Sequence, residues 1–244
     1  GVAINGTDAG NYSIDSTSLI NSADITARTV TLSASKTYDG TTGLTGNVTV
    51  GTGVNGENLT YTGATASDAH VATASNYINA ITLGDQVGAS ASSGGLVSNY
   101  QLPTLNAANA PLTITAATLT PTLSNSGVSK TYDGTTNAPG GFTPTYSFSG
   151  LVSGDTATLT TATGVAYNSK DVATANLVTV SGLGIANITG SKGSLASDYV
   201  LDTTSKTVSA TITKAPLTVR ANDDADFVTQ TKTGTDTYAG VSYS

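Results

Sequence analysis

The sequence contains no cysteine, no tryptophan and no methionine, and its only histidine is His70. Without cysteine the chain can form neither a disulfide nor a thiolate metal site. Charged residues make up 10% of the chain, against about a quarter in an average globular protein. Three phenylalanines and 11 tyrosines supply all the aromatic side chains. Such a composition predicts thin β layers rather than one thick aromatic core.

Positive charge is also scarce. Nine Lys and Arg face 16 Asp and Glu, which gives a net charge of −7. Nucleic-acid binders cluster their basic residues on the phosphate backbone, so we expect no nucleic-acid partner and no attraction to an anionic membrane. No apolar run approaches the roughly 20 residues that cross a bilayer, so we expect no membrane insertion. No signal peptide opens the sequence, and we expect any targeting segment to lie outside it.

The chain repeats itself. The octapeptide that begins at Ser35 and ends at Thr42 recurs letter for letter from Ser129 to Thr136, 94 residues later. Other markers recur in the same order: Ile25, Ile114 and Ile212 before Thr; Val54-Asn55-Gly56-Glu57 and Val152-Ser153-Gly154-Asp155; Val71 to Ala74 and Val172 to Ala175; and Asn11-Tyr12, Asn99-Tyr100 and Asp198-Tyr199. Repeats of this kind indicate tandem units.

The markers divide the chain into four parts. Residues 28–116 and 117–214 are complete units, residues 1–27 are the end of a preceding unit, and residues 215–244 are the start of a following one. The period is too long for one rung of a solenoid, which takes about 20–45 residues. It favours a string of independent domains.

Apolar residues alternate with polar ones throughout both units. The spaced pairs are Val30 and Leu32, Val48 and Val50, Leu59 and Tyr61, Leu112 and Ile114, Tyr146 and Phe148, Val178 and Val180, and Ala210 and Ile212. Period two predicts strands with one buried face, and Asn55-Gly56 and Gly154-Asp155 are hairpin-type turns. We therefore predict an all-β fold of tandem, immunoglobulin-like β-sandwich modules. Neither the sequence around Ala116 nor that around Pro216 holds a flexible spacer, so one unit should pass directly into the next and form an elongated rod.

The octapeptide resembles the signature of the YDG repeat domain. This family occurs in large bacterial surface proteins of the filamentous-haemagglutinin type. The segment from Lys214 to Asp224 is similar to the opening of the related MBG repeats, although Tyr238-Ala239-Gly240 stands where Tyr-Asp-Gly is expected. The resemblance implies export, a location at the bacterial cell surface, and a role in adhesion or biofilm structure.

The Tyr-Asp-Gly motif has two interpretations. One is a ligand or cation site on Asp39 and Asp133. The other, which we favour, is a structural turn in which Asp bonds to its own backbone and Gly takes a positive φ. The turn residues are Tyr38, Asp39, Gly40, Tyr132, Asp133 and Gly134.

The remaining candidate sites are weaker. Asp223, Asp224 and Asp226 form the one tight acidic cluster, and their spacing does not fit an EF-hand, so we expect no bound metal and no cofactor. The second unit has no histidine where the first has His70, so we interpret His70 as a loop residue rather than a catalytic base. The sequence leaves open whether calcium binds at the joints between units.

Lys36 and Lys130 precede the repeated tyrosines. A lysine inside a β-sandwich can be cross-linked to an asparagine, but no facing Asn with an acid beside it stands out. We favour a solvated lysine that blocks edge-to-edge pairing.

The sequence thus predicts a structural spacer rather than an enzyme. Its expected partners are neighbouring repeats of the same chain, with host glycans or proteins and self-association left open. The alternative is a carbohydrate-binding module that stacks sugars on exposed tyrosines, for which Tyr61, Tyr77 and Tyr167 are the candidates.

Overall fold

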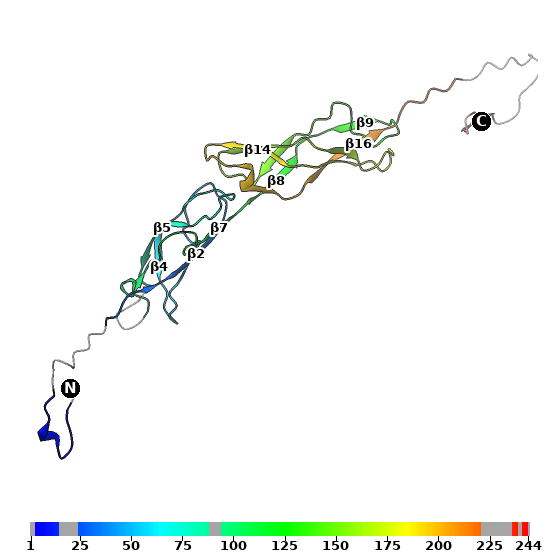
Figure 1. Cartoon of the computed structure of the whole chain (residues 1–244). Helices are drawn as coiled ribbons and strands as arrows, with labels where there is room; N and C mark the ends of the chain where they lie inside the picture. The colour runs from blue at the N-terminus through cyan, green and yellow to red at the C-terminus, as the bar shows by residue number, and fades with distance from the viewer. Residues whose placement is uncertain (1–2, 15–23, 88–93, 221–235, 239–240, 244) are drawn as a thin grey trace, which may run out of the picture.

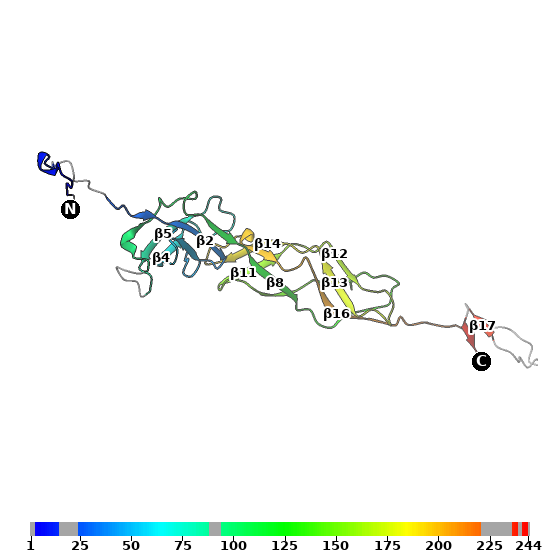
Figure 2. The same cartoon turned by 90° about the horizontal axis from the view of Figure 1, so that it is seen from below.

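The computed structural model describes residues 3–14, 24–87, 94–220, 236–238 and 241–243. Over these residues the regular structure is strand, apart from three single-turn 3-10 helices, so the all-β prediction is confirmed. Two units lie end to end: the chain enters near residue 24 at one extreme and leaves near residue 214 at the other (Figures 1 and 2). Within the described ranges, no helix has the length and apolarity needed to cross a membrane.

The first unit contains β1 (Arg28–Thr29), β2 (Thr31–Thr37), β3 (Val48–Gly51), β4 (Thr60–Ala66), β5 (Ile78–Gly84), the 3-10 helix η3 (Val97–Asn99), β6 (Tyr100–Gln101) and β7 (Leu112–Thr115). Its strands form small sheets in the orders β1-β6, β3-β2-β7 and β4-β5.

The second unit contains β8 (Ala117–Leu123), β9 (Val128–Thr131), β10 (Tyr146–Ser149), β11 (Asp155–Leu159), β12 (Gly164–Tyr167), β13 (Leu177–Ser181), β14 (Ile185–Gly190), the 3-10 helix η4 (Ala196–Asp198), β15 (Tyr199–Leu201) and β16 (Ser205–Thr213). Its sheets have the orders β10-β8-β15, β11-β14 and β12-β13-β16-β9.

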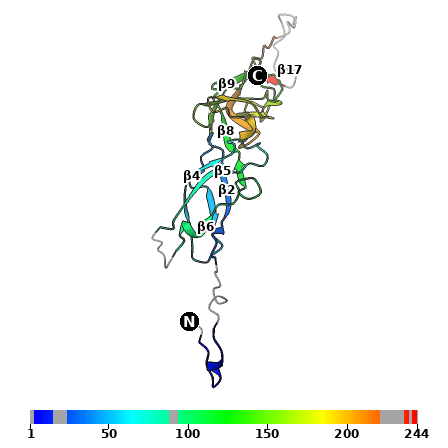
Figure 3. The same cartoon turned by 60° about the vertical axis from the view of Figure 1, so that its left-hand side comes forward.

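In each unit the second strand runs parallel to the last. β2 pairs with β7 from Ala34 opposite Leu112 onward, and β9 pairs with β16 in the same sense. The short pairs β1–β6 and β8–β15 are parallel too. Parallel partners point the same way, so the chain leaves each unit at the end opposite to its entry. This pairing is what sets the next unit in line (Figure 3).

The predicted alternation is present in the strands. Along β2 every second residue is buried, and β8 shows the same pattern. The buried row of β2 consists of Leu32, Ala34 and Lys36. A lysine in an apolar row needs hydrogen-bond acceptors, and these are supplied by Asp39 and Thr41 of the octapeptide and by Gly43 just after it.

One hydrophobic cluster crosses from the first unit into the second. It includes Tyr38 and Leu44 on one side and Leu119 and Tyr199 on the other, and all four are buried. The far part of the second unit has its own clusters, for example around Val178. The prediction of independent domains is therefore wrong in one respect, because apolar side chains at the joint pack against each other.

The two joints differ. Ala116 alone separates β7 from β8, which confirms the predicted direct passage. At the second joint, residues 214–220 form no strand and are exposed, so direct passage there is not found. A strand needs a hydrogen-bonded neighbour, and within the described ranges no strand pairs with these residues. Beyond them, β17 (Asp236–Tyr238) pairs with β18 (Val241–Tyr243).

Candidate functional site

The two octapeptides fold into the same turn. The Asp39 carboxylate accepts a hydrogen bond of 2.9 Å from the backbone N–H of Thr41, and Gly40 adopts a φ of 74°. In the second unit Asp133 accepts the corresponding bond at 2.9 Å, and Gly134 has a φ of 78°. An Asp that bonds two residues ahead and a Gly with positive φ are the two requirements of this turn.

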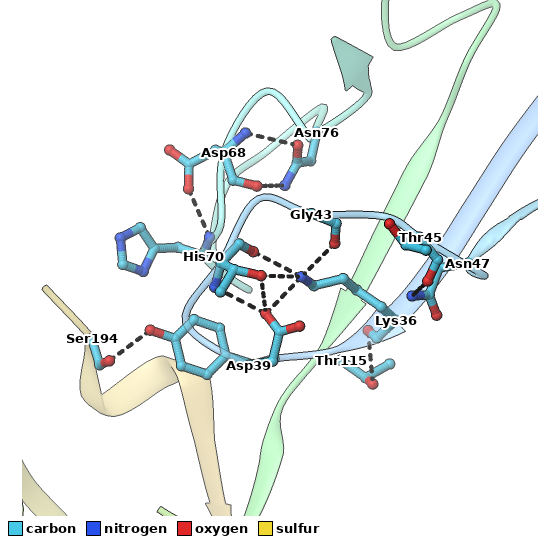
Figure 4. A network of polar contacts seen from close by, with 12 residues as sticks. Lys36, Asp39, Gly43, Thr45, Asn47, Asp68, His70, Asn76, Thr115 and Ser194 are labelled. Atoms are coloured by element: carbon cyan, nitrogen blue, oxygen red, sulfur yellow. Dashed lines mark hydrogen bonds and ion pairs between the residues drawn. The ribbon is translucent and has the colours of Figure 1, made fainter. Parts of the chain in front are cut away.

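The Lys36 side chain reaches into the loop between Gly43 and Asp39 (Figure 4). Its ammonium donates to Asp39 Oδ1 at 2.6 Å, to the Thr41 carbonyl at 2.7 Å and to the Gly43 carbonyl at 3.0 Å. Its side chain is 3% exposed. Lys130 makes the equivalent contacts with Asp133 at 2.8 Å and with the Thr135 carbonyl at 2.9 Å. The expectation of a solvated edge lysine is therefore wrong, because each lysine closes the octapeptide loop.

These contacts lower the pKa of both aspartates. Burial by itself would raise the pKa of Asp39, but hydrogen bonds from Lys36 and Thr41 outweigh it and the net shift is downward. The hydrogen bond from Lys130, with two more from Thr135, lowers the pKa of Asp133 to about 2. The carboxylates stay ionised at neutral pH and are already engaged in the turn.

The first octapeptide also forms one face of the joint. Tyr38 is 3% exposed, and its hydroxyl donates to Ser194 Oγ of the second unit at 2.6 Å. Its ring meets that of Tyr199 edge to face, with 5.6 Å between the centroids, and lies against the ring of His70 at 6.2 Å. Burial, together with the nearby carboxylates of Asp198 and Asp155, raises the pKa of Tyr38.

Asp198 is the polar centre of the joint. It is fully buried and ends η4. Its Oδ1 accepts the backbone N–H of Val71 at 2.9 Å, whereas its Oδ2 accepts the backbone N–H of Leu195 at 2.8 Å and lies 2.8 Å from His70 Nδ1. An ionised carboxylate only accepts, so His70 donates from Nδ1. The single histidine therefore joins the units.

Tyr199 anchors the other side of the joint. Its hydroxyl donates to Asp155 Oδ2 at 2.6 Å and accepts the Val152 N–H at 3.1 Å. Burial and the bond to Asp155 raise the pKa of Tyr199 to about 12. The first unit repeats the contact, because the Tyr100 hydroxyl donates to Glu57 at 2.5 Å. The markers found by comparing the repeats are thus a bonded tyrosine–acid pair in each unit.

The three candidate sugar platforms differ in burial. Tyr167 is 4% exposed, and its hydroxyl donates to the Thr211 carbonyl at 3.0 Å. The expectation that Tyr167 is exposed is wrong, because its ring packs in the core of the second unit. Tyr61 is half-buried beside a surface pocket and donates to the Leu44 carbonyl. Tyr77 is also half-buried, and its backbone forms an isolated antiparallel β-bridge with Pro111.

The acidic cluster of Asp223, Asp224 and Asp226 lies outside the described residues, as do Ala239 and Gly240. Among the residues that the structure describes, no three His, Asp or Glu side chains are grouped so that they could hold a metal ion.

Comparison with known families bears on the second unit. Residues 115–208 match the YDG domain. This segment is a YDG domain. The YDG domain begins at the end of β7, ends within β16 and includes the second octapeptide. No curated protein and no solved structure matches the chain.

Sequence reasoning missed the joint. It identified Asp198-Tyr199 as a repeat marker and His70 as a loop residue, but 128 residues separate His70 from Asp198. The available signal was a difference between repeats: His70 has Asp171 as its counterpart, and Asp198 has Asn99.

Proposed function

We propose that this chain is a structural stalk, in which β-sandwich units joined in series form a rod that holds another part of a surface protein away from the cell. The observation that carries the proposal is the joint, where only Ala116 separates β7 from β8 and where Tyr38 and Asp198 are buried. A flexible linker would leave such residues exposed. The proposal assigns the chain no catalytic role.

The proposed location at the cell surface is supported by composition and family. A cysteine-free chain folds without an oxidising compartment, and a net charge of −7 favours solubility. The YDG domain, together with the resemblance of the C-terminal segment to MBG repeats, supports a place in a secreted bacterial adhesin of the filamentous-haemagglutinin type. Adhesion or biofilm formation is the role of the whole protein in this proposal.

The absence of cysteine makes a direct test possible. Thr49→Cys and Ser147→Cys place two unique spin labels on exposed positions of β3 and β10, one in each unit. Pulsed electron spin resonance on the full chain should give one narrow distance distribution. Inserting a Gly-Ser-Gly-Ser segment after Ala116 should broaden it. A broad distribution in the uninterrupted chain would contradict the stalk.

A further inference from the structure

Each unit has two ends with matching surfaces. At the joint, the C-terminal end of the first unit contributes Tyr38 and His70, and the N-terminal end of the second contributes Asp198 and Tyr199. The repeats give each of these a counterpart at an outer end, namely Tyr132, Asp171, Asn99 and Tyr100.

Backbone contacts confirm the correspondence. In the first unit the loop that carries His70 is closed by a hydrogen bond from the Ser67 N–H to the Tyr77 carbonyl. In the second unit the loop that carries Asp171 is closed in the same way, by a hydrogen bond from the Asn168 N–H to the Leu177 carbonyl. Asn99 and Asp198 are each the last residue of a 3-10 helix that leads into a buried tyrosine. The outer ends therefore share the backbone structure of the two ends that meet at the joint.

The outer ends are exposed where the joint is buried. Tyr132 is 39% exposed and Tyr38 is 3% exposed. Asn99 and Asp171 are exposed, whereas Asp198 is fully buried. The C-terminal end of the second unit thus presents the surface that, in the first unit, is covered by a neighbour.

The polar pair at the joint differs from its counterparts in charge. His70 meets Asp198, but the second unit carries Asp171 at the histidine position. An Asp171 set against an Asp198-type neighbour would bring two carboxylates to within hydrogen-bond distance in a buried place, which is strongly unfavourable. An asparagine would instead donate from Nδ2 to the aspartate and accept the N–H of the facing loop with Oδ1, although the helix N–H that Asp198 Oδ2 accepts from Leu195 would lose its acceptor.

Asparagine ends the two other 3-10 helices among the residues that the structure describes. The first unit has Asn99, and the 3-10 helix η1 (Ala9–Asn11) ends at Asn11 before Tyr12. Aspartate occurs at this position only in the described unit that faces His70. Histidine with aspartate is one matched combination, and aspartate with asparagine is the other.

We propose that the C-terminal end of the second unit is a docking surface for the N-terminal end of another repeat unit whose 3-10 helix ends in asparagine. Positions 70 and 198 and their counterparts, here called the joint pair, select that neighbour. This inference rests on the proposed function, because it takes the units to be arranged in series. It names which units accept each other.

Four versions of the full, spin-labelled chain test the proposal as a double-mutant cycle. His70→Asp creates the forbidden pair of carboxylates, and Asp198→Asn restores a neutral partner. The double variant reproduces the joint expected between the second unit and its neighbour. Wild type and Asp198→Asn should both give narrow distance distributions, since a neutral His70 can accept at Nδ1 from the asparagine Nδ2 while the asparagine Oδ1 keeps the Val71 N–H.

His70→Asp should broaden the distribution and lower the hydrogen-exchange protection of the Val71 amide by at least about tenfold. The double variant should restore a narrow distribution and most of that protection. A purely structural role for Asp198 predicts the opposite, namely that a second change at the joint makes it worse. Unchanged exchange at Ile78, in the core of the first unit, and at Val178 and Val180, in the core of the second, shows that both units stay folded.

The proposal is overturned if His70→Asp is as rigid as wild type, or if the double variant is no better than His70→Asp. A broad distribution in wild type contradicts the stalk itself and is thereby distinguished from a failure of the joint pair alone.

Discussion

Tyr38 and Tyr132 occupy the same position in two identical octapeptides, yet the first is 3% exposed and the second 39% exposed. Local sequence is the same, so the difference comes from the neighbouring unit. The Tyr38 hydroxyl is bonded to Ser194 across the joint. Equivalent residues at the two ends therefore provide matched variants in one molecule.

Tyr38→Phe should reduce the free energy of unfolding by about 1–3 kcal/mol, because the buried Ser194 hydroxyl loses its donor. Tyr132→Phe keeps the same ring and should change the stability by no more than about 0.5 kcal/mol. Urea denaturation of both variants measures the difference. Equal effects would show that the joint contributes nothing at Tyr38.

Gly40→Ala should cost more than Gly134→Ala. Both glycines have positive φ, so each alanine carries a backbone penalty of about 1–2 kcal/mol. At Gly134 nothing lies within 4 Å of the new Cβ, whereas at Gly40 the Val152 Cγ1 atom of the second unit would be 3.0 Å away. We expect about 1 kcal/mol of additional destabilisation from this overpacking. Urea midpoints that fall equally would contradict the close approach of Val152.

Lys36→Met should destabilise the chain by about 1–3 kcal/mol, although methionine keeps the apolar stem. The Thr41 and Gly43 carbonyls lose their donor, and Asp39 loses its ion pair. Lys206→Met is the control, because the Lys206–Asp202 pair lies at the surface and should contribute no more than about 1 kcal/mol. Calorimetric melting of the two variants measures the two losses of stability side by side. A Lys36 effect as small as that of Lys206 would mean that the buried lysine does not hold the turn.

Acid should weaken the second turn over a defined range. The pKa of Asp133 is about 2 in the fold, below the ordinary aspartate value of 3.8. A depressed carboxyl pKa stabilises the fold above the unfolded value and loses that contribution as the pH falls through the folded one. The loss should therefore occur between about pH 4 and pH 2, and Asp133→Asn should abolish it. Carbon-detected NMR titration of the Asp133 carboxyl measures the pKa directly, and a midpoint near 3.8 would contradict the Lys130 contact.

The sequence could predict the strands and the repeats, because alternation and turn residues are local properties. Val178 and Val180 lie buried in β13, and Asp39-Gly40 forms a turn. It could not predict that Lys36 is buried, since the acceptors that satisfy it appear only once the loop closes. It could not place His70 opposite Asp198 either, because that contact depends on how two units pack. The charge of one residue is informative there only when the facing residue is known.

The parallel pairing of β2 with β7 also determines how a unit responds to tension. In the proposed stalk, a pull along its axis would act on the N-terminal end of β2 and the C-terminal end of β7, and so would slide the two strands past each other. The backbone bonds of all four registered pairs, from Ala34–Leu112 to Thr37–Thr115, then carry the load together instead of opening one by one. Resistance to forced unfolding depends on the unfolding barrier rather than on the net stability. A thin core with few aromatic residues is thereby compatible with high tensile strength.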